Sequence, residues 1–119
     1  MASQNVWERA TGASAISTTV TPTSAPAVGY KAKQWMLVAV YLHLSAAGAA
    51  GNFTITRDAA AGSACDLVVL SQAMLALTDV AFVPEVPMPM DAGDALVCAY
   101  SNSGSKTYGL EVVWQRQEG

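Results

Sequence analysis

The chain contains a single histidine, His43, and this limits the chemistry that its side chains can support. A Ser or Cys nucleophile normally needs a His-type base, and a triad would require His43 to meet an Asp and a Ser from distant segments. His43 lies between Leu42 and Leu44, a setting typical of a partly buried histidine with one hydrogen-bond partner. We therefore expect no enzyme activity and no catalytic residues. An enzyme of unfamiliar design that uses His43 is kept as an alternative.

The cysteines and the paired carboxylates do not form a metal-binding pattern. The separation of Cys65 and Cys98 fits no zinc motif, so we expect two buried free thiols, with a single disulfide as the alternative. Asp91 and Asp94 flank Ala-Gly without the alternating Asp/Asn run of a calcium loop, and we expect them to cap a turn. No glycine-rich phosphate loop is present. The sequence predicts no metal and no cofactor.

Aromatic side chains are the remaining candidates for a binding site. Three Trp and four Tyr residues could line a carbohydrate-binding face, but their spacing along strands favours the core or a subunit interface for most of them. They are Trp7, Trp35, Trp114, Tyr30, Tyr41, Tyr100 and Tyr108.

The composition indicates one globular domain with unusually little charge. Of the 119 residues, 52% are hydrophobic and 13% are charged, against a usual charged share of about 25%. This excludes a disordered chain, and a net charge of −3 with scattered basic residues argues against nucleic-acid binding. No apolar run reaches the roughly 18 residues of a membrane-spanning helix, so we expect no membrane partner. The first residues lack a signal-peptide pattern, so we expect synthesis in a cytoplasm.

The hydrophobic pattern predicts short strands separated by Pro/Gly loops, with no convincing helix. The segment Trp35–Leu44 is apolar on both parities, which is typical of a strand covered on both faces. The last two strands, separated by residues 101–106, predict a hairpin. These features together predict an all-β fold, an antiparallel β-sandwich. The clearest strands are expected at Trp35–Leu44, Asn52–Asp58, Cys65–Leu70, Leu77–Val83, Ala95–Tyr100 and Thr107–Gln115.

The first third of the chain differs from the rest. Residues 10–33 are rich in Ala, Ser, Thr and Pro, with one plausible strand at Ala15–Thr21 followed by the breakers Pro22, Pro26 and Gly29. We therefore predict an extended N-terminal arm over residues 1–33 and a β-sandwich domain over residues 34–119.

One parity of the first long strand supplies our candidates for contacts between subunits. Obligate interfaces are poor in charge and resemble a divided core, and a strand with two apolar faces fits that description. The candidate oligomer-interface residues are Trp35, Leu37, Tyr41 and His43.

The C-terminal half carries a recognisable arrangement. The proline-spaced stretch Val83–Met90 leads into Asp91-Ala92-Gly93-Asp94, and the strand Ala95–Tyr100, a Ser/Asn/Gly turn and the closing strand Tyr108–Trp114 follow. Together with the earlier strands, this resembles the small jelly-roll proteins of tailed-phage virions, above all capsid decoration (cement) proteins. The resemblance covers roughly residues 30–116.

The resemblance implies a homo-oligomer, a trimer or a dimer, on the outer surface of the capsid and bound to the major capsid protein. It implies a jelly-roll topology and an arm that reaches across neighbouring capsomers, and it offers no catalytic residues. The leading hypothesis is therefore a non-enzymatic virion protein that stabilises the assembled shell. The alternatives are a tail, baseplate or fibre-associated jelly-roll module and a carbohydrate-binding module used for adsorption to a host.

Overall fold

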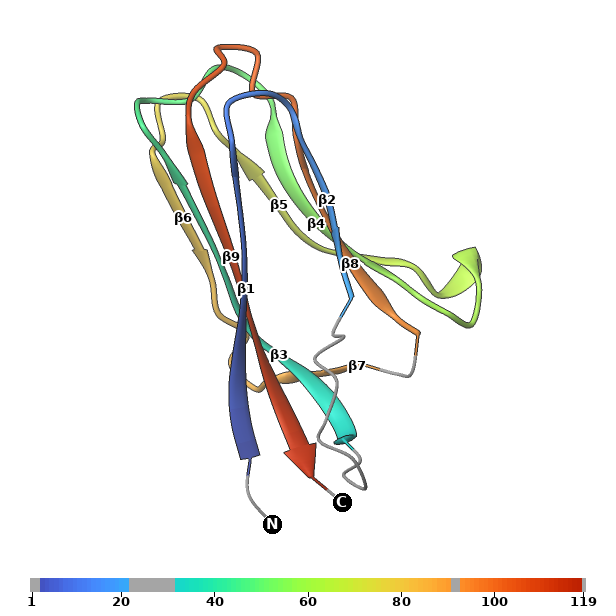
Figure 1. Ribbon diagram of the computed structural model, residues 1–119. Helices are drawn as coiled ribbons and strands as arrows, with labels where there is room; N and C mark the ends of the chain where they lie inside the picture. The colour runs from blue at the N-terminus through green and yellow to red at the C-terminus, as the bar shows by residue number, and fades with distance from the viewer. Residues whose placement is uncertain (1–2, 22–31, 91–92, 119) are drawn as a thin grey trace.

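The computed structural model describes residues 3–21, 32–90 and 93–118. In these ranges the chain is built from nine strands and one short 3-10 helix (Figure 1). The strands are β1 (Ser3–Gly12), β2 (Ile16–Val20), β3 (Ala32–Leu44), β4 (Asn52–Asp58), β5 (Leu67–Ala73), β6 (Asp79–Phe82), β7 (Met88–Met90), β8 (Ala95–Tyr100) and β9 (Tyr108–Glu118), and the helix is η1 (Ser63–Cys65). No helix among the described residues is long and apolar enough to cross a membrane.

The strands form two antiparallel sheets that pack against each other, as Figure 1 shows. The five-stranded sheet has the order β1-β9-β3-β6, and β7 pairs with β3 next to β6. The four-stranded sheet has the order β2-β8-β4-β5. The predicted all-β, antiparallel architecture is therefore confirmed.

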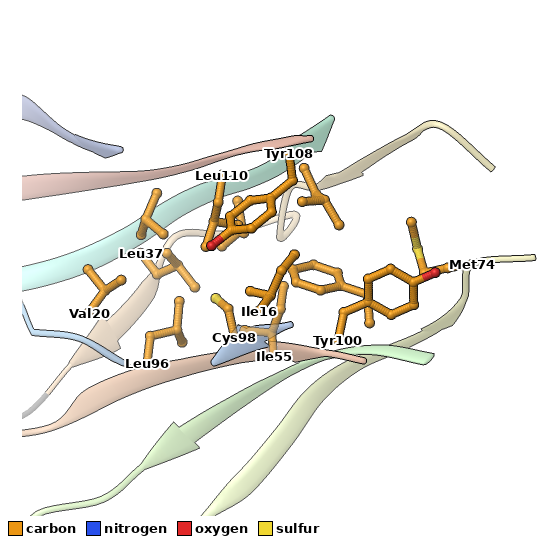
Figure 2. Close-up of a cluster of buried hydrophobic side chains, with 14 of the residues drawn as sticks. Ile16, Val20, Leu37, Ile55, Met74, Leu96, Cys98, Tyr100, Tyr108 and Leu110 are labelled. Carbon is orange, nitrogen blue, oxygen red and sulfur yellow. The ribbon is translucent and has the colours of Figure 1, made fainter. Parts of the chain in front are cut away.

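The core lies between the two sheets, where side chains of one parity from each strand meet. Figure 2 shows Leu37 and Leu110 of the five-stranded sheet facing Leu96 and Cys98 of the four-stranded sheet. The largest fully buried side chain is that of Trp114 on β9. This alternation of buried and outward residues is the period-two pattern that the sequence carries.

A β-bulge in β3 changes which residues face the core. The register between β3 and β9 shifts between Leu37 and Ala39, so Val38 is an extra residue on β3. An extra residue moves every later side chain to the opposite face. Leu37 is therefore buried in the core together with Val40 and Leu42, although these residues differ in parity.

The last two strands do not form the predicted hairpin. β8 pairs with β2 and β4, whereas β9 pairs with β1 and β3 in the other sheet. The loop between them crosses from one sheet to the other instead of turning back within one. The buried Asn102 fixes this crossing, because its Nδ2 donates to the carbonyl oxygens of Ser14 and Lys106 at 2.8 and 2.9 Å.

The N-terminal region also differs from its prediction. β1 pairs with β9 over ten residues, and β2 pairs with β8, so residues 3–12 and 16–20 belong to the two sheets. The expected strand at Ala15–Thr21 is found as β2. The arm predicted over residues 1–33 is wrong where the chain forms β1 and β2, because both strands belong to the sandwich. The domain boundary placed at residue 34 is wrong for the same reason. Polar residues in β1 hid a strand that is half-buried on one face and exposed on the other. Residues 22–31 of the predicted arm, and Asp91 of the predicted turn, lie outside the described residues.

Candidate functional site

The outer face of the five-stranded sheet gathers aromatic and charged side chains from four strands. Arg9 of β1 lies opposite Glu111 of β9, and Glu111 lies opposite Tyr41 of β3. His43 of β3 lies opposite Asp79 of β6. Directly opposed residues on one face of a sheet are close enough to interact, and each of these pairs spans neighbouring strands. The arrangement therefore forms a continuous band across the sheet.

One end of the band combines an ion pair with stacked aromatic rings. Arg9 Nε donates to Glu111 Oε2 at 2.5 Å, and the guanidinium lies 5.3 Å from the centre of the Trp7 ring. The Trp7 and Tyr41 rings are stacked, with centroids 6.4 Å apart and an angle of 20° between their planes. Trp7 is 47% exposed, so much of its surface remains open to a ligand.

The other end carries an exposed histidine–carboxylate pair. His43 Nδ1 and Asp79 Oδ1 lie 2.5 Å apart, and Thr78 Oγ1 donates to Asp79 Oδ2 at 2.8 Å. The hydrogen bond from His43, followed by that from Thr78, lowers the pKa of Asp79 below its usual value. Asp79 is therefore an ionised hydrogen-bond acceptor at neutral pH.

Gly109 separates the two pairs and leaves a groove between them. A Cβ atom added to Gly109 would meet nothing within 4 Å, so the absence of a side chain there leaves open space. Two hollows of about 400 and 180 Å³ adjoin at this point and share His43, Gly109 and Glu111 as lining residues. We call this combined depression the Gly109 groove.

The predicted interface residues do not share one face. Leu37 is 0% exposed and lies in the core, while Trp35 is half-buried against that core. Tyr41 and His43 point outward from the five-stranded sheet, beyond the bulge at Val38. The bulge separates the two groups, so Leu37 is corrected from an interface candidate to a core residue. Tyr41 and His43 remain candidates for contact with another molecule.

The remaining aromatic and thiol groups are mostly structural. Tyr100 and Tyr108 are buried, as Trp114 is. Cys98 is buried as predicted, and burial raises its pKa to about 12. Cys65 is exposed on η1, which corrects the expectation that both thiols are buried, and both cysteines are free. In the described part of the chain, no three His, Cys, Asp or Glu side chains gather where they could hold a metal ion.

The outer face of the four-stranded sheet has a different character. The charged residues of its four strands are Arg57 and Asp58, both at the end of β4, and Arg57 is half-buried with Nη2 donating to the carbonyl oxygen of Cys65. Elsewhere the outward positions carry hydroxyl and small apolar side chains that lie opposite one another in register. We call them the uncharged face: Ser17, Thr19, Thr54, Thr56, Val68, Ser71, Val97 and Ala99.

Sequence reasoning singled out Tyr41 and His43 but missed the other members of the band. Trp7 was considered as an aromatic residue without a position in a sheet, while Arg9, Asp79 and Glu111 were not considered as site residues. The signal that locates Trp7 and Arg9 is the alternation of β1, where Val6, Glu8 and Ala10 take one parity and Trp7, Arg9 and Thr11 take the other. Comparison of the chain with protein-family models, with curated proteins and with solved structures found no match.

Proposed function

We propose that this chain is a non-enzymatic structural protein of a phage virion, a jelly-roll decoration protein that acts as an oligomer on the outer surface of the capsid. The strand pairing supports the jelly-roll part of the proposal. β1 lies beside β9, β2 beside β8, β3 beside β6 and β7, and β4 beside β5. The chain thus pairs its first strand with its last and continues inward, as expected for a long hairpin wrapped into a double sheet.

The observation that carries the functional proposal is the uncharged face. Charged residues are depleted at the centres of protein interfaces, and a flat sheet face without charge can approach another protein surface at little desolvation cost. Thr56 and Val97, which lie opposite each other on β4 and β8, mark the middle of this face. Exposed apolar side chains extend it to the edge strand β5, where Val68 is 58% exposed.

The edge of the four-stranded sheet supports association between copies. β5 is an edge strand, and Leu67 and Val68 on it are exposed. An exposed apolar edge promotes pairing with another chain unless it is covered. An oligomer with closed symmetry would cover it, and binding of that oligomer to the assembled shell alone would stabilise the shell by mass action.

Co-sedimentation with capsids tests the proposal. Purified protein is mixed with mature capsids that lack it, with the major capsid protein as the expected partner, and separated on a sucrose gradient. We expect the wild-type protein to sediment with the particles. We expect Thr56→Lys, which places a charge on the uncharged face, to remain at the top of the gradient. Thr11→Lys makes the same change on the outer face of the five-stranded sheet and should still sediment with capsids.

Two results would contradict the proposal. A wild-type protein that never sediments with capsids would refute binding to the shell, and a stable monomer by light scattering would refute the oligomer. Electron microscopy of labelled particles distinguishes the two positions. A decoration protein would place the label on the capsid surface, whereas a tail, baseplate or fibre protein would place it on the tail.

A further inference from the structure

We propose that the Gly109 groove is a binding site for neutral saccharides. The site lies on the face opposite the uncharged face, so this inference goes beyond the proposed role on the shell and does not depend on it. The groove combines polar groups that still have hydrogen-bonding capacity with an open floor, and the Tyr41 ring that lines it stacks with Trp7 next to the groove.

The polar groups of the groove suit hydroxyl ligands. The Glu111 and Asp79 carboxylates accept hydrogen bonds, while the Arg9 guanidinium and the His43 ring donate them. The Arg9–Glu111 and His43–Asp79 pairs each use only part of this capacity, because a guanidinium has five N–H donors and a carboxylate has about four lone-pair sites. A hydroxyl group both donates and accepts, so neighbouring hydroxyls on a sugar ring match donors and acceptors that alternate along the groove.

The charge balance favours a neutral ligand. The charge of Arg9 is balanced by that of Glu111, and the Asp79 carboxylate already has hydrogen-bond partners in His43 and Thr78, so both carboxylates of the groove are engaged. An anionic ligand would compete with two carboxylates for the same donors, and a cationic ligand would have to break an existing pair. A neutral polyhydroxylated ligand avoids both costs.

The aromatic side chains provide an apolar surface beside the polar groups. The exposed Trp7 ring is held in place by stacking with Tyr41 and by the Arg9 guanidinium above it. A sugar ring has one face of C–H groups, and contact of that face with the Trp7 ring would remove apolar surface from water.

The shape of the groove is compatible with such a ligand. The larger hollow, of about 400 Å³, falls within the usual range of roughly 300–1,000 Å³ for small-molecule sites. The space exists because residue 109 is glycine, and a Cβ atom added there would meet nothing within 4 Å. Filling the groove from this position therefore leaves every polar group in place.

A glycan array carrying neutral and acidic glycans, followed by calorimetry with the strongest neutral hit, tests the proposal. We expect neutral glycans to bind, and we expect Gly109→Val and Trp7→Ala each to weaken binding at least about tenfold. Ala73→Val creates the same valine side chain, by adding two methyl groups, at an exposed strand position on the other sheet and should bind as the wild type does. Circular dichroism of each variant checks that the fold is retained, and Gly109→Val keeps the test valid if Trp7→Ala fails to fold.

Several outcomes would overturn the inference. An array without neutral hits would refute the site, and a preference for acidic glycans would refute the class of ligand. Neutral binding that survives Gly109→Val would place the site elsewhere. A Gly109→Val protein that loses only co-sedimentation with capsids would show instead that this face contacts protein. The capsid experiment with Thr56→Lys is independent, so failure of one proposal is distinguishable from failure of the other.

Discussion

Replacement of Leu37 by alanine tests the bulge in β3, on which the assignment of both sheet faces depends. Leu37 is 0% exposed and lies between Trp114 of β9 and Met88 of β7 in the register of the sheet. Leu37→Ala removes buried methyl groups, and the flanking strands are hydrogen-bonded to β3, so the cavity cannot close easily. Buried Leu→Ala changes cost about 2–5 kcal/mol, and the rigid surroundings place this one at about 3–4 kcal/mol.

Urea unfolding followed by circular dichroism measures this loss. For a domain of this size a slope of about 1–3 kcal/mol per molar urea converts the expected loss into a midpoint lower by about 1–4 M. Leu75→Ala is the matched control, because it makes the same change in a side chain that is 66% exposed and outside the uncharged face. Its expected effect is about 0.5 kcal/mol or less.

Light scattering of the same variants separates a core residue from an interface residue. A core role predicts that Leu37→Ala lowers the free energy of unfolding while the folded protein keeps its native mass. A loss below about 1 kcal/mol, together with dissociation into smaller species, would instead place Leu37 at a subunit contact. That result would refute the register at the bulge and the assignment of outward residues beyond it.

Three further predictions concern the two cysteines, Glu8 of β1 and Asn102 in the loop between β8 and β9. Ellman's reagent at pH 8 should titrate one thiol per native chain and two after unfolding, because Cys65 is exposed while burial raises the pKa of Cys98 to about 12; two fast native thiols would contradict this. Burial raises the pKa of Glu8, and a polar interaction with the Trp114 side chain opposes this shift. The stability that protonated Glu8 supplies is therefore present below the unfolded-state pKa and is lost as pH rises through the higher folded-state pKa. The melting temperature of Glu8→Gln should therefore rise relative to that of the wild type between pH 4 and pH 7. A difference in melting temperature that does not change with pH would contradict the burial of Glu8. Asn102→Ala removes hydrogen bonds of 2.8, 2.9 and 3.1 Å that fix the loop between β8 and β9, so urea unfolding should show a loss of about 2–4 kcal/mol; an unchanged midpoint would show that the loop does not need them.

β4 and β8 occupy the ranges predicted for them. In β4, alternating apolar and polar residues identify a half-buried strand directly, whereas β8 is a short apolar run bounded by turn residues. β1 was missed because Glu8 interrupts the apolar parity and Arg9 follows it. In an edge strand such an interruption is tolerated, because one side of the strand remains close to water.

Strand pairing and side-chain direction were harder to predict, for a physical reason. A six-residue loop such as residues 101–106 can return within one sheet or cross to the other, and neither outcome changes the pattern of the flanking strands. The bulge at Val38 has the same property, since a segment that is apolar on both parities does not reveal where the faces exchange. The candidate interface set failed at this point, with Leu37 assigned to the wrong side.

The low charge of the chain is unevenly divided between its two outer faces, and this division makes the two proposals compatible. The five-stranded sheet carries the ion pair Arg9–Glu111 and the hydrogen-bonded pair His43–Asp79 around the Gly109 groove, whereas the uncharged face lies on the opposite side of the sandwich. A molecule docked through the uncharged face would therefore turn the groove toward solvent. Decorated particles should then bind the same neutral glycan as the free protein, and they should lose that binding when they carry Gly109→Val. Free protein that binds the glycan while decorated particles do not would place the groove, rather than the uncharged face, against the shell.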